Sequence, residues 1–107
     1  MNAPPNPDDP APDSGSAGAV TRILKIVNEK GLHARASAKF VQLVERFDAK
    51  VTVSHKGESA GGESIMGLMM LAAGIGSAIS VTASGREAQE AITALDALVS
   101  TRFGEDE

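Results

Sequence analysis

The sequence predicts an α+β fold in which three helices lie on one face of a four-stranded, mainly antiparallel sheet, in the order β-α-β-β-α-β-α. Three observations support this class. Some segments alternate between apolar and polar residues, whereas others carry apolar residues at helical spacing. All five prolines fall in the first twelve residues, which separates a tail from a folding body. That body has about 90 residues, enough for one domain.

The first half of the body predicts a strand, a helix and a hairpin. Thr21–Val27 is rich in β-branched residues, as in a strand covered on one face. Lys50–Lys56 alternates and predicts a strand, and Glu58–Ala60 follows the turn at Gly57 as a short return strand. Between them a helix begins near Arg35, because the apolar residues form one helical stripe: Ala36, Phe40, Leu43, Val44 and Phe47.

The second half predicts a short helix, a strand and a longer helix. Ser64 follows two glycines and can cap a helix over Ile65–Leu71. Ala78–Ala83 alternates as a strand does. Ser84–Glu87 has the spacing of a capping box for a helix that begins at Ala88. Its apolar stripe continues to about Phe103, after which Gly104 can end the helix.

The two ends of the chain differ from the body in composition and charge. Residues 1–19 are mostly Pro, Asp, Gly, Ser and Ala, and they predict a disordered tail. Residues 105–107 form an acidic C-terminal end. The six acids at the two ends leave eight of the chain's 14 acids in residues 20–104, against all ten bases. The body is therefore mildly basic, and the bases are scattered.

Composition excludes several functional classes. The chain has no Cys, which rules out a disulfide framework and a zinc–thiolate site. Scattered bases and three Phe as the only aromatic residues do not suit nucleic-acid binding. No segment has the length of a membrane span, and no secretion signal begins the chain. We expect a cytoplasmic protein that binds neither nucleic acid nor membrane.

Residues Gly31–Ser37 carry the main candidate site, between a strand and a helix. A helix start offers unpaired N–H groups and the positive end of its dipole, which suits an anion. His33 lies just before that start, and its neutral ring nitrogen is a nucleophile. Arg35 adds a guanidinium suited to phosphate oxygens. No nearby acid or base is expected to activate water, so the site favours holding a phosphoryl group over hydrolysing it.

The second histidine, His55, differs from His33 in its surroundings. His55 lies in a predicted strand beside Lys56, with no helix start and no Arg nearby, so we expect a structural or surface role. Neither histidine has a partner at metal-ligand spacing, and no metal site or cofactor is expected.

The segment Gly31–Arg35, together with Ala38, Phe40 and Val41, resembles the active-site segment of the histidine-containing phosphocarrier (HPr) family of the bacterial sugar phosphotransferase system. Glu63–Met69 resembles that family's regulatory serine segment, at the same separation from the histidine. Gly85 before the last helix also fits the pattern. The resemblance covers about residues 20–104 and implies an open-faced β-sandwich of four strands and three helices.

The resemblance also implies roles and partners. His33 would accept a phosphoryl group on Nδ1 from enzyme I, charged by phosphoenolpyruvate, and pass it to a IIA protein. Arg35 would stabilise the phosphoryl charge, with the helix start at Ala34 and Ala36 cradling it. A relay of this kind is not an enzyme with turnover on a small substrate, and we expect a monomer. One departure is Ala36, where the family usually has a proline that preorganises the first turn; Ser37 then adds a hydroxyl near that turn.

Ser64 is the second site that the resemblance implies. It would be phosphorylated by an ATP-dependent HPr kinase/phosphorylase, although Glu63 stands where many relatives carry a lysine. A phosphate at a helix start is tolerated, so it would change surface charge without unfolding the helix. The same helix is too short to bury every side, and an exposed patch of Ile65, Met66 and Met69 would meet partners. Met as buried gap filler is the alternative.

Other functions remain open from the sequence. The relay could serve sugar transport or a regulatory, nitrogen-related branch. A pure interaction module could bind a regulator through the surface around Ser64, but it would need neither His33 nor Arg35. A small-ligand regulatory domain would need a concave pocket, for which the loops at Gly61–Gly62 and Gly74–Gly76 are the candidates.

Overall fold

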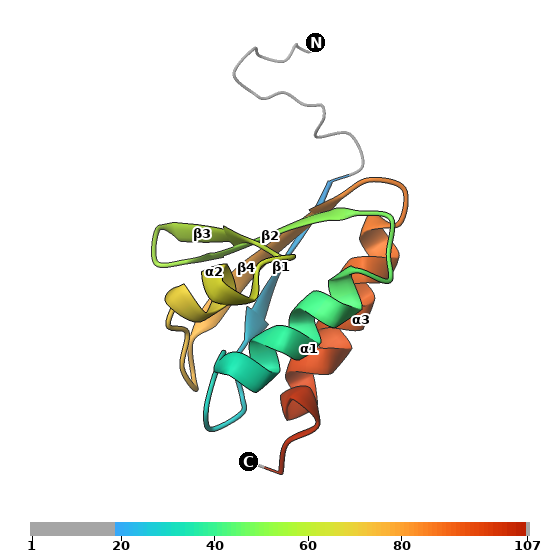
Figure 1. The fold of residues 1–107 in the computed structure, drawn as a ribbon. Coiled ribbons are helices and arrows are strands. Elements are labelled where there is room, and N and C mark those ends of the chain that lie inside the picture. The colour runs from blue at the N-terminus through green and yellow to red at the C-terminus, as the bar shows by residue number, and fades with distance from the viewer. Residues whose placement is uncertain (1–18, 107) are drawn as a thin grey trace.

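The computed structural model describes residues 19–106 and contains the predicted elements in the predicted order (Figure 1). The expected tail up to Gly18, and Glu107, lie outside the described residues. The elements are β1 (Val20–Lys25), α1 (Ala34–Val44), β2 (Lys50–His55), β3 (Glu58–Gly61), α2 (Ile65–Met70), β4 (Ala78–Ser84), α3 (Ala88–Ser100) and a 3₁₀ turn, η1 (Arg102–Gly104).

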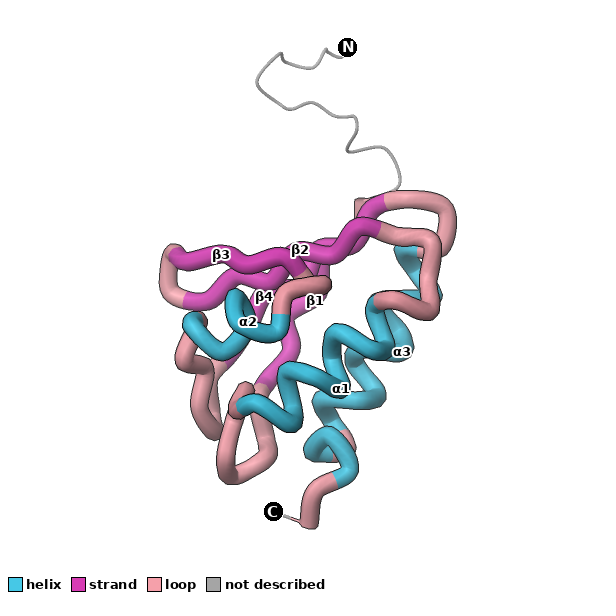
Figure 2. Tube along the Cα trace, viewed as in Figure 1, coloured by secondary structure: helices cyan, strands magenta, loops and turns pink. Residues whose placement is uncertain are grey.

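The four strands form one sheet in the order β1-β4-β2-β3, and every pairing is antiparallel. The three helices lie on one face of this sheet, as Figure 2 shows. The opposite face carries small hydroxyl side chains, including the hydrogen-bonded pairs Thr21–Thr82 and Ser54–Ser59. This arrangement confirms the predicted open-faced α+β sandwich.

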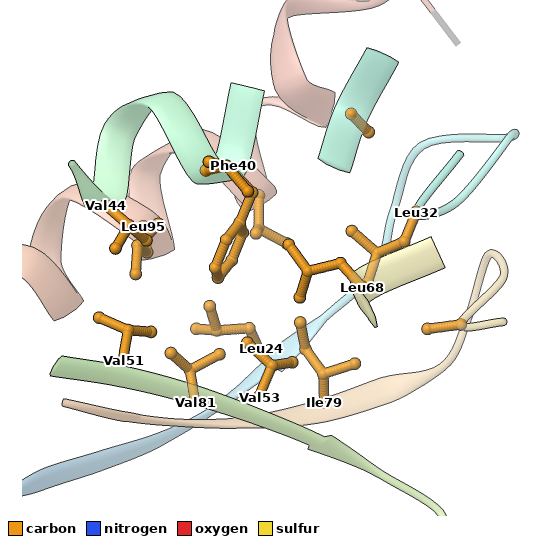
Figure 3. Close-up of a cluster of buried hydrophobic side chains, with 14 of the residues drawn as sticks. Leu24, Leu32, Phe40, Val44, Val51, Val53, Leu68, Ile79, Val81 and Leu95 are labelled. Carbon is orange, nitrogen blue, oxygen red and sulfur yellow. The ribbon is translucent and has the colours of Figure 1, made fainter. Parts of the chain in front are cut away.

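The core lies between the helices and the inner face of the sheet (Figure 3). Phe40 of α1 is fully buried there, packed in the same cluster as Leu68 of α2 and Leu95 of α3. The inner face of the sheet supplies aliphatic residues from alternate positions of β2 and β4: Val51, Val53, Ile79 and Val81. Burial of these side chains fixes α1 against the sheet, and with it the loop that leads into the helix.

The last helix ends earlier than predicted. α3 stops at Ser100, and the chain then reverses through Arg102 (φ 60°) and Phe103 (φ 54°), both in the left-handed region. Left-handed backbone is rare for residues other than glycine, so the sequence gives no sign of this break. Burial of Phe103 and a hydrogen bond from Lys39 Nζ to its carbonyl oxygen (2.6 Å) hold the reversal. The reversal turns the acidic end of the chain back toward the start of α1.

The predicted capping box at Ser84–Glu87 is wrong. Ser84 lies in β4, and Glu87 is the residue that precedes α3, without a side-chain cap. The carboxylate of Glu87 instead accepts a hydrogen bond from the backbone N–H of Asp48 (2.7 Å). The spacing of Ser84 and Glu87 matches a capping box, but β4 extends through Ser84, so no serine lies at the start of α3.

Candidate functional site

His33 occupies the N-cap position of α1, which begins at Ala34, as the sequence predicts. The loop before it is held from behind. Leu32 is buried, and its N–H donates to the carbonyl oxygen of Ala73 (3.0 Å). Gly31 has φ 65°, and a Cβ there would lie 2.4 Å from that same oxygen, so only glycine fits this close approach. The imidazole is therefore presented from a fixed loop at a helix start.

The first turn of α1 leaves backbone donors free. The N–H groups of Ala34, Arg35 and Ala36 make no hydrogen bond within residues 19–106, as expected for a helix start. Ala34 and Arg35 are exposed, whereas Ala36 is fully buried. The hydroxyl of Ser37 turns inward to the carbonyl oxygen of Leu32 (3.2 Å). Among these predicted residues, Ala34 and Arg35 are the ones within reach of a ligand beside His33.

The structure brings an acid to His33 that the sequence interpretation missed. Nε2 of His33 lies 2.6 Å from Oε2 of Glu105, and both side chains are largely shielded from solvent, at 26% and 14% exposure. From the sequence we expect no nearby acid or base able to activate water, and this carboxylate beside the imidazole is not anticipated. Since Nε2 is engaged, Nδ1 is the remaining nitrogen, and no hydrogen bond reaches it from residues 19–106.

Glu105 is itself held by a hydrogen bond from the buried side chain of Asn28. The Asn28 side chain is completely buried, and its Nδ2 donates to Glu105 Oε1 (3.1 Å) and to the carbonyl oxygen of Gly31 (2.9 Å). Burial raises the pKa of the Glu105 carboxyl, but hydrogen bonds from His33 and Asn28 and the charges of His33 and Lys30 hold that pKa below its ordinary value of 4.5. Glu105 is thus an ionised carboxylate at neutral pH.

A surface pocket of about 470 Å³ opens beside His33. Its basic lining residues are Lys30, Arg35 and Lys39, and Gly104, Glu105 and Asp106 complete it. Arg35 is exposed and forms no ion pair within the described residues, so its guanidinium remains available to a ligand. The three cationic side chains outnumber the two acidic ones in the lining, and together with the helix start they give the pocket the character of an anion site.

Ser64 caps α2 as predicted, since its hydroxyl accepts a hydrogen bond from the N–H of Gly67 (2.9 Å). The predicted patch residues are exposed: Ile65 at 41%, Met66 at 68% and Met69 at 37%. The methionines are therefore surface groups, not gap fillers in the core. The loop after α2 supplies Ala73, whose carbonyl oxygen accepts a hydrogen bond from Leu32 N–H, so the segment that follows α2 is tied to the His33 loop.

His55 has the structural role that the sequence predicts. It is buried, and its Nδ1 donates to the carbonyl oxygen of Leu71 (2.9 Å), which ties β2 to the end of α2. Within residues 19–106, no group of His, Asp and Glu could hold a metal ion. Nor is any helix in this range long and apolar enough to cross a membrane.

Sequence reasoning located His33 and Arg35 but missed four residues that surround them. Lys30 and Lys39 lie close in sequence to the predicted anion site, and their positive charge is a signal that could have found them. Asn28 and Glu105 gave none, because Glu105 is 72 positions from His33 and its approach depends on the reversal at η1.

Comparisons with known proteins support one family. The family model for the "PTS HPr component phosphorylation site" matches residues 20–101. The chain is 52% identical to phosphocarrier protein HPr of Cupriavidus necator over 80% of this chain and 97% of the relative. It is 39% identical to phosphocarrier protein NPr of Shewanella violacea over 78% and 92%. A solved HPr structure from Thermoanaerobacter tengcongensis matches with a TM-score of 0.78 at 35% identity, over 82% and 99%.

Proposed function

The chain belongs to the HPr family of phosphocarrier proteins of the phosphotransferase system, and from that premise we propose that it relays a phosphoryl group through His33. Enzyme I, charged by phosphoenolpyruvate, is the donor, and a IIA-type protein is the acceptor. The observation that carries the proposal is the Nδ1 of a histidine at a helix start, which accepts no hydrogen bond from residues 19–106 and lies beside a pocket lined by three basic side chains. The chain acts as a monomeric cytoplasmic relay, without turnover on a small substrate.

Transfer requires one bond to form and one to break. The lone pair on Nδ1 of His33 attacks phosphorus, while the N–P bond on the donor histidine of enzyme I breaks and its electrons return to the donor ring. Positioning and charge stabilisation dominate such a step. The exposed N–H groups at Ala34 and Arg35 and the Arg35 guanidinium would receive the phosphoryl oxygens. Ala36 N–H is buried and would need local movement to join them.

Glu105 does not convert this site into a hydrolase. Its Oε2 accepts a hydrogen bond from His33 and its Oε1 accepts one from Asn28. Burial raises the pKa of the Glu105 carboxyl, but these hydrogen bonds hold that pKa below its ordinary value, so the carboxylate is a weak base toward water. The expectation that the site holds a phosphoryl group therefore stands on a different reason from the one given by the sequence.

Partner binding would use the exposed patch of Ile65, Met66 and Met69 on α2, the helix whose following loop is hydrogen-bonded to the His33 loop at Ala73. We propose that an HPr kinase/phosphorylase phosphorylates Ser64 from ATP at this patch. The added charge would repel acidic surface on enzyme I and slow transfer to His33. Equal rates for wild type and Ser64→Asp would contradict this regulation.

The experiment is incubation with enzyme I and phosphoenolpyruvate, followed by intact-mass measurement. The wild type and a His55→Gln variant should each gain one phosphoryl group, and His33→Ala should gain none. Uptake of acid-labile phosphate by His33→Ala would overturn the assignment.

The similarity to an NPr supports a second candidate, a relay in the nitrogen-related branch that is not coupled to sugar uptake. Purified acceptors distinguish the two. Rapid transfer from phosphorylated His33 to a sugar-branch IIA protein supports the first, whereas preferential transfer to a nitrogen-branch IIA protein supports the second.

A further inference from the structure

We propose that Glu105 is a positioning residue for phosphoryl transfer, which holds the imidazole proton of His33 on Nε2 so that Nδ1 is the accepting nitrogen, and that Asn28 holds Glu105 in place. This inference rests on the proposed relay function and adds two residues to it. Asn28 lies at a buried loop position, and Glu105 belongs to the acidic end of the chain.

The contact between Glu105 and His33 fixes the position of one ring proton. An ionised carboxylate only accepts hydrogen bonds, so the 2.6 Å contact requires a proton on Nε2. A neutral imidazole carries one ring proton, which leaves the Nδ1 lone pair free. Glu105 thereby selects the tautomer that the proposed transfer needs.

Asn28 reinforces this arrangement from the protein interior. Both of its near neighbours, Glu105 Oε1 and the carbonyl oxygen of Gly31, accept hydrogen bonds, so the amide nitrogen must face them. This orientation leaves Asn28 Oδ1 buried without a partner in residues 19–106. A buried oxygen without a partner is costly. The orientation is nevertheless kept, because the Asn28 amide N–H groups join the carbonyl oxygen of Gly31 to the carboxylate of Glu105.

The same contact stabilises the phosphorylated state. When the Nδ1 lone pair forms the new N–P bond, the ring keeps its Nε2 proton and gains positive charge. Glu105 Oε2 faces that proton and offsets the charge without taking part in bond exchange. When the group leaves for the acceptor, the N–P electrons return to Nδ1 and the ring is neutral again. No proton has to enter or leave the site during either step.

The charged residues around the pair differ in position, which supplies a control. Lys30, Arg35 and Lys39 line the pocket from the loop and from α1, and Asp106 lines it from the C-terminal side. Asp106 is exposed and has no hydrogen bond or ion pair within residues 19–106. It carries the same charge as Glu105 in the same pocket but forms no hydrogen bond to His33 within residues 19–106, so Asp106→Ala controls for the loss of one negative charge from the pocket.

The first test uses the unphosphorylated protein and needs no partner. Nitrogen-15 NMR should detect the Nε2–H proton of His33 as a slowly exchanging resonance in wild type and Asp106→Ala. The resonance should be lost in Glu105→Ala. Its persistence in a folded Glu105→Ala protein would overturn the proposal.

The second test measures transfer from enzyme I. Glu105→Ala and Glu105→Gln should lower the maximal rate by about tenfold to a hundredfold, the effect typical of losing a hydrogen bond to a charged group. The KM for enzyme I should stay unchanged, because the proposed role of Glu105 is to hold the ring proton of His33 and not to bind the partner. Glu105→Gln keeps the size of the side chain, but it cannot accept from both His33 and Asn28, since its amide has one oxygen.

The outcomes separate this inference from the relay function. If wild type, Asp106→Ala and Glu105→Ala all fail to take phosphate, the relay function itself is wrong. If all three take phosphate at the same maximal rate, the relay stands and the role of Glu105 is refuted. A rise in KM at constant maximal rate would assign Glu105 to partner docking and also refute it.

Discussion

Substituting Gly31 by alanine tests whether the His33 loop is as tightly fixed as the structure indicates. Gly31 has φ 65°, and a left-handed backbone costs an L-residue roughly 1–2 kcal/mol. The added Cβ would also lie 2.4 Å from Ala73 O and 2.8 Å from Gly74 Cα, both backbone atoms. To relieve this contact the loops must separate, which breaks the hydrogen bond from Leu32 N–H to Ala73 O at a further cost of about 1–2 kcal/mol.

The expected loss in free energy of unfolding for Gly31→Ala is therefore about 3 kcal/mol. Gly57→Ala is the matched control, because Gly57 has φ 85° and nothing within 4 Å of an added Cβ. It should lose only the backbone part, about 1 kcal/mol. Urea unfolding at equilibrium measures both values. Equal destabilisation of the two variants would refute the argument that the close approach to Ala73 fixes the loop.

Three further perturbations test other parts of the site. Ala36→Pro should change the free energy of unfolding by less than about 1 kcal/mol, because the Ala36 N–H makes no hydrogen bond within residues 19–106. Ala38→Pro lies inside α1 and should lower the free energy of unfolding by about 3 kcal/mol, and urea unfolding measures both values. Ser64→Ala should lose about 1 kcal/mol, since it removes the bond to Gly67 N–H, yet leave phosphate uptake by His33 intact. Because the folded-state pKa of Glu105 lies below 4.5, its ionised form should stabilise the fold above about pH 4.5 and lose that contribution as the pH falls through the lower folded-state pKa.

Each of these expectations has a contrary outcome. Similar losses for the two proline variants would mean that the first turn of α1 does not tolerate proline better than its interior. A Ser64→Ala protein as stable as wild type would contradict the claim that the Ser64 hydroxyl stabilises the start of α2. For Glu105, the difference in stability between wild type and Glu105→Ala should shrink on acidification. A difference that stays constant from neutral pH to well below pH 4.5 would contradict the pKa direction.

The sequence predicted features whose signals are local. Helical and alternating periodicity identified the elements, and Ser64 and His33 were placed at helix starts because caps and glycine turns act over a few residues. The reversal at Arg102 and Phe103 was not predictable from propensity, since it depends on burial of Phe103 against the core. The contact of Glu105 with His33 follows from that reversal, so it became visible only in three dimensions.

The capping-box error has a related cause. Ser84 and Glu87 have the spacing of a capping box, but Ser84 belongs to β4 and pairs with Lys50 of β2. Tertiary structure thus overrode a local signal. At the His33 loop the local and tertiary signals agree, because Gly31 satisfies both the turn and the close approach to Ala73.

The most direct test of the account is to locate the phosphoryl group after treatment with enzyme I and phosphoenolpyruvate. Peptide mapping should assign it to His33, and nitrogen-15 and phosphorus-31 NMR should show the bond at Nδ1 with the proton retained on Nε2. Phosphate on Nε2, on His55 or on another residue, or no phosphate at all, would contradict the relay through His33.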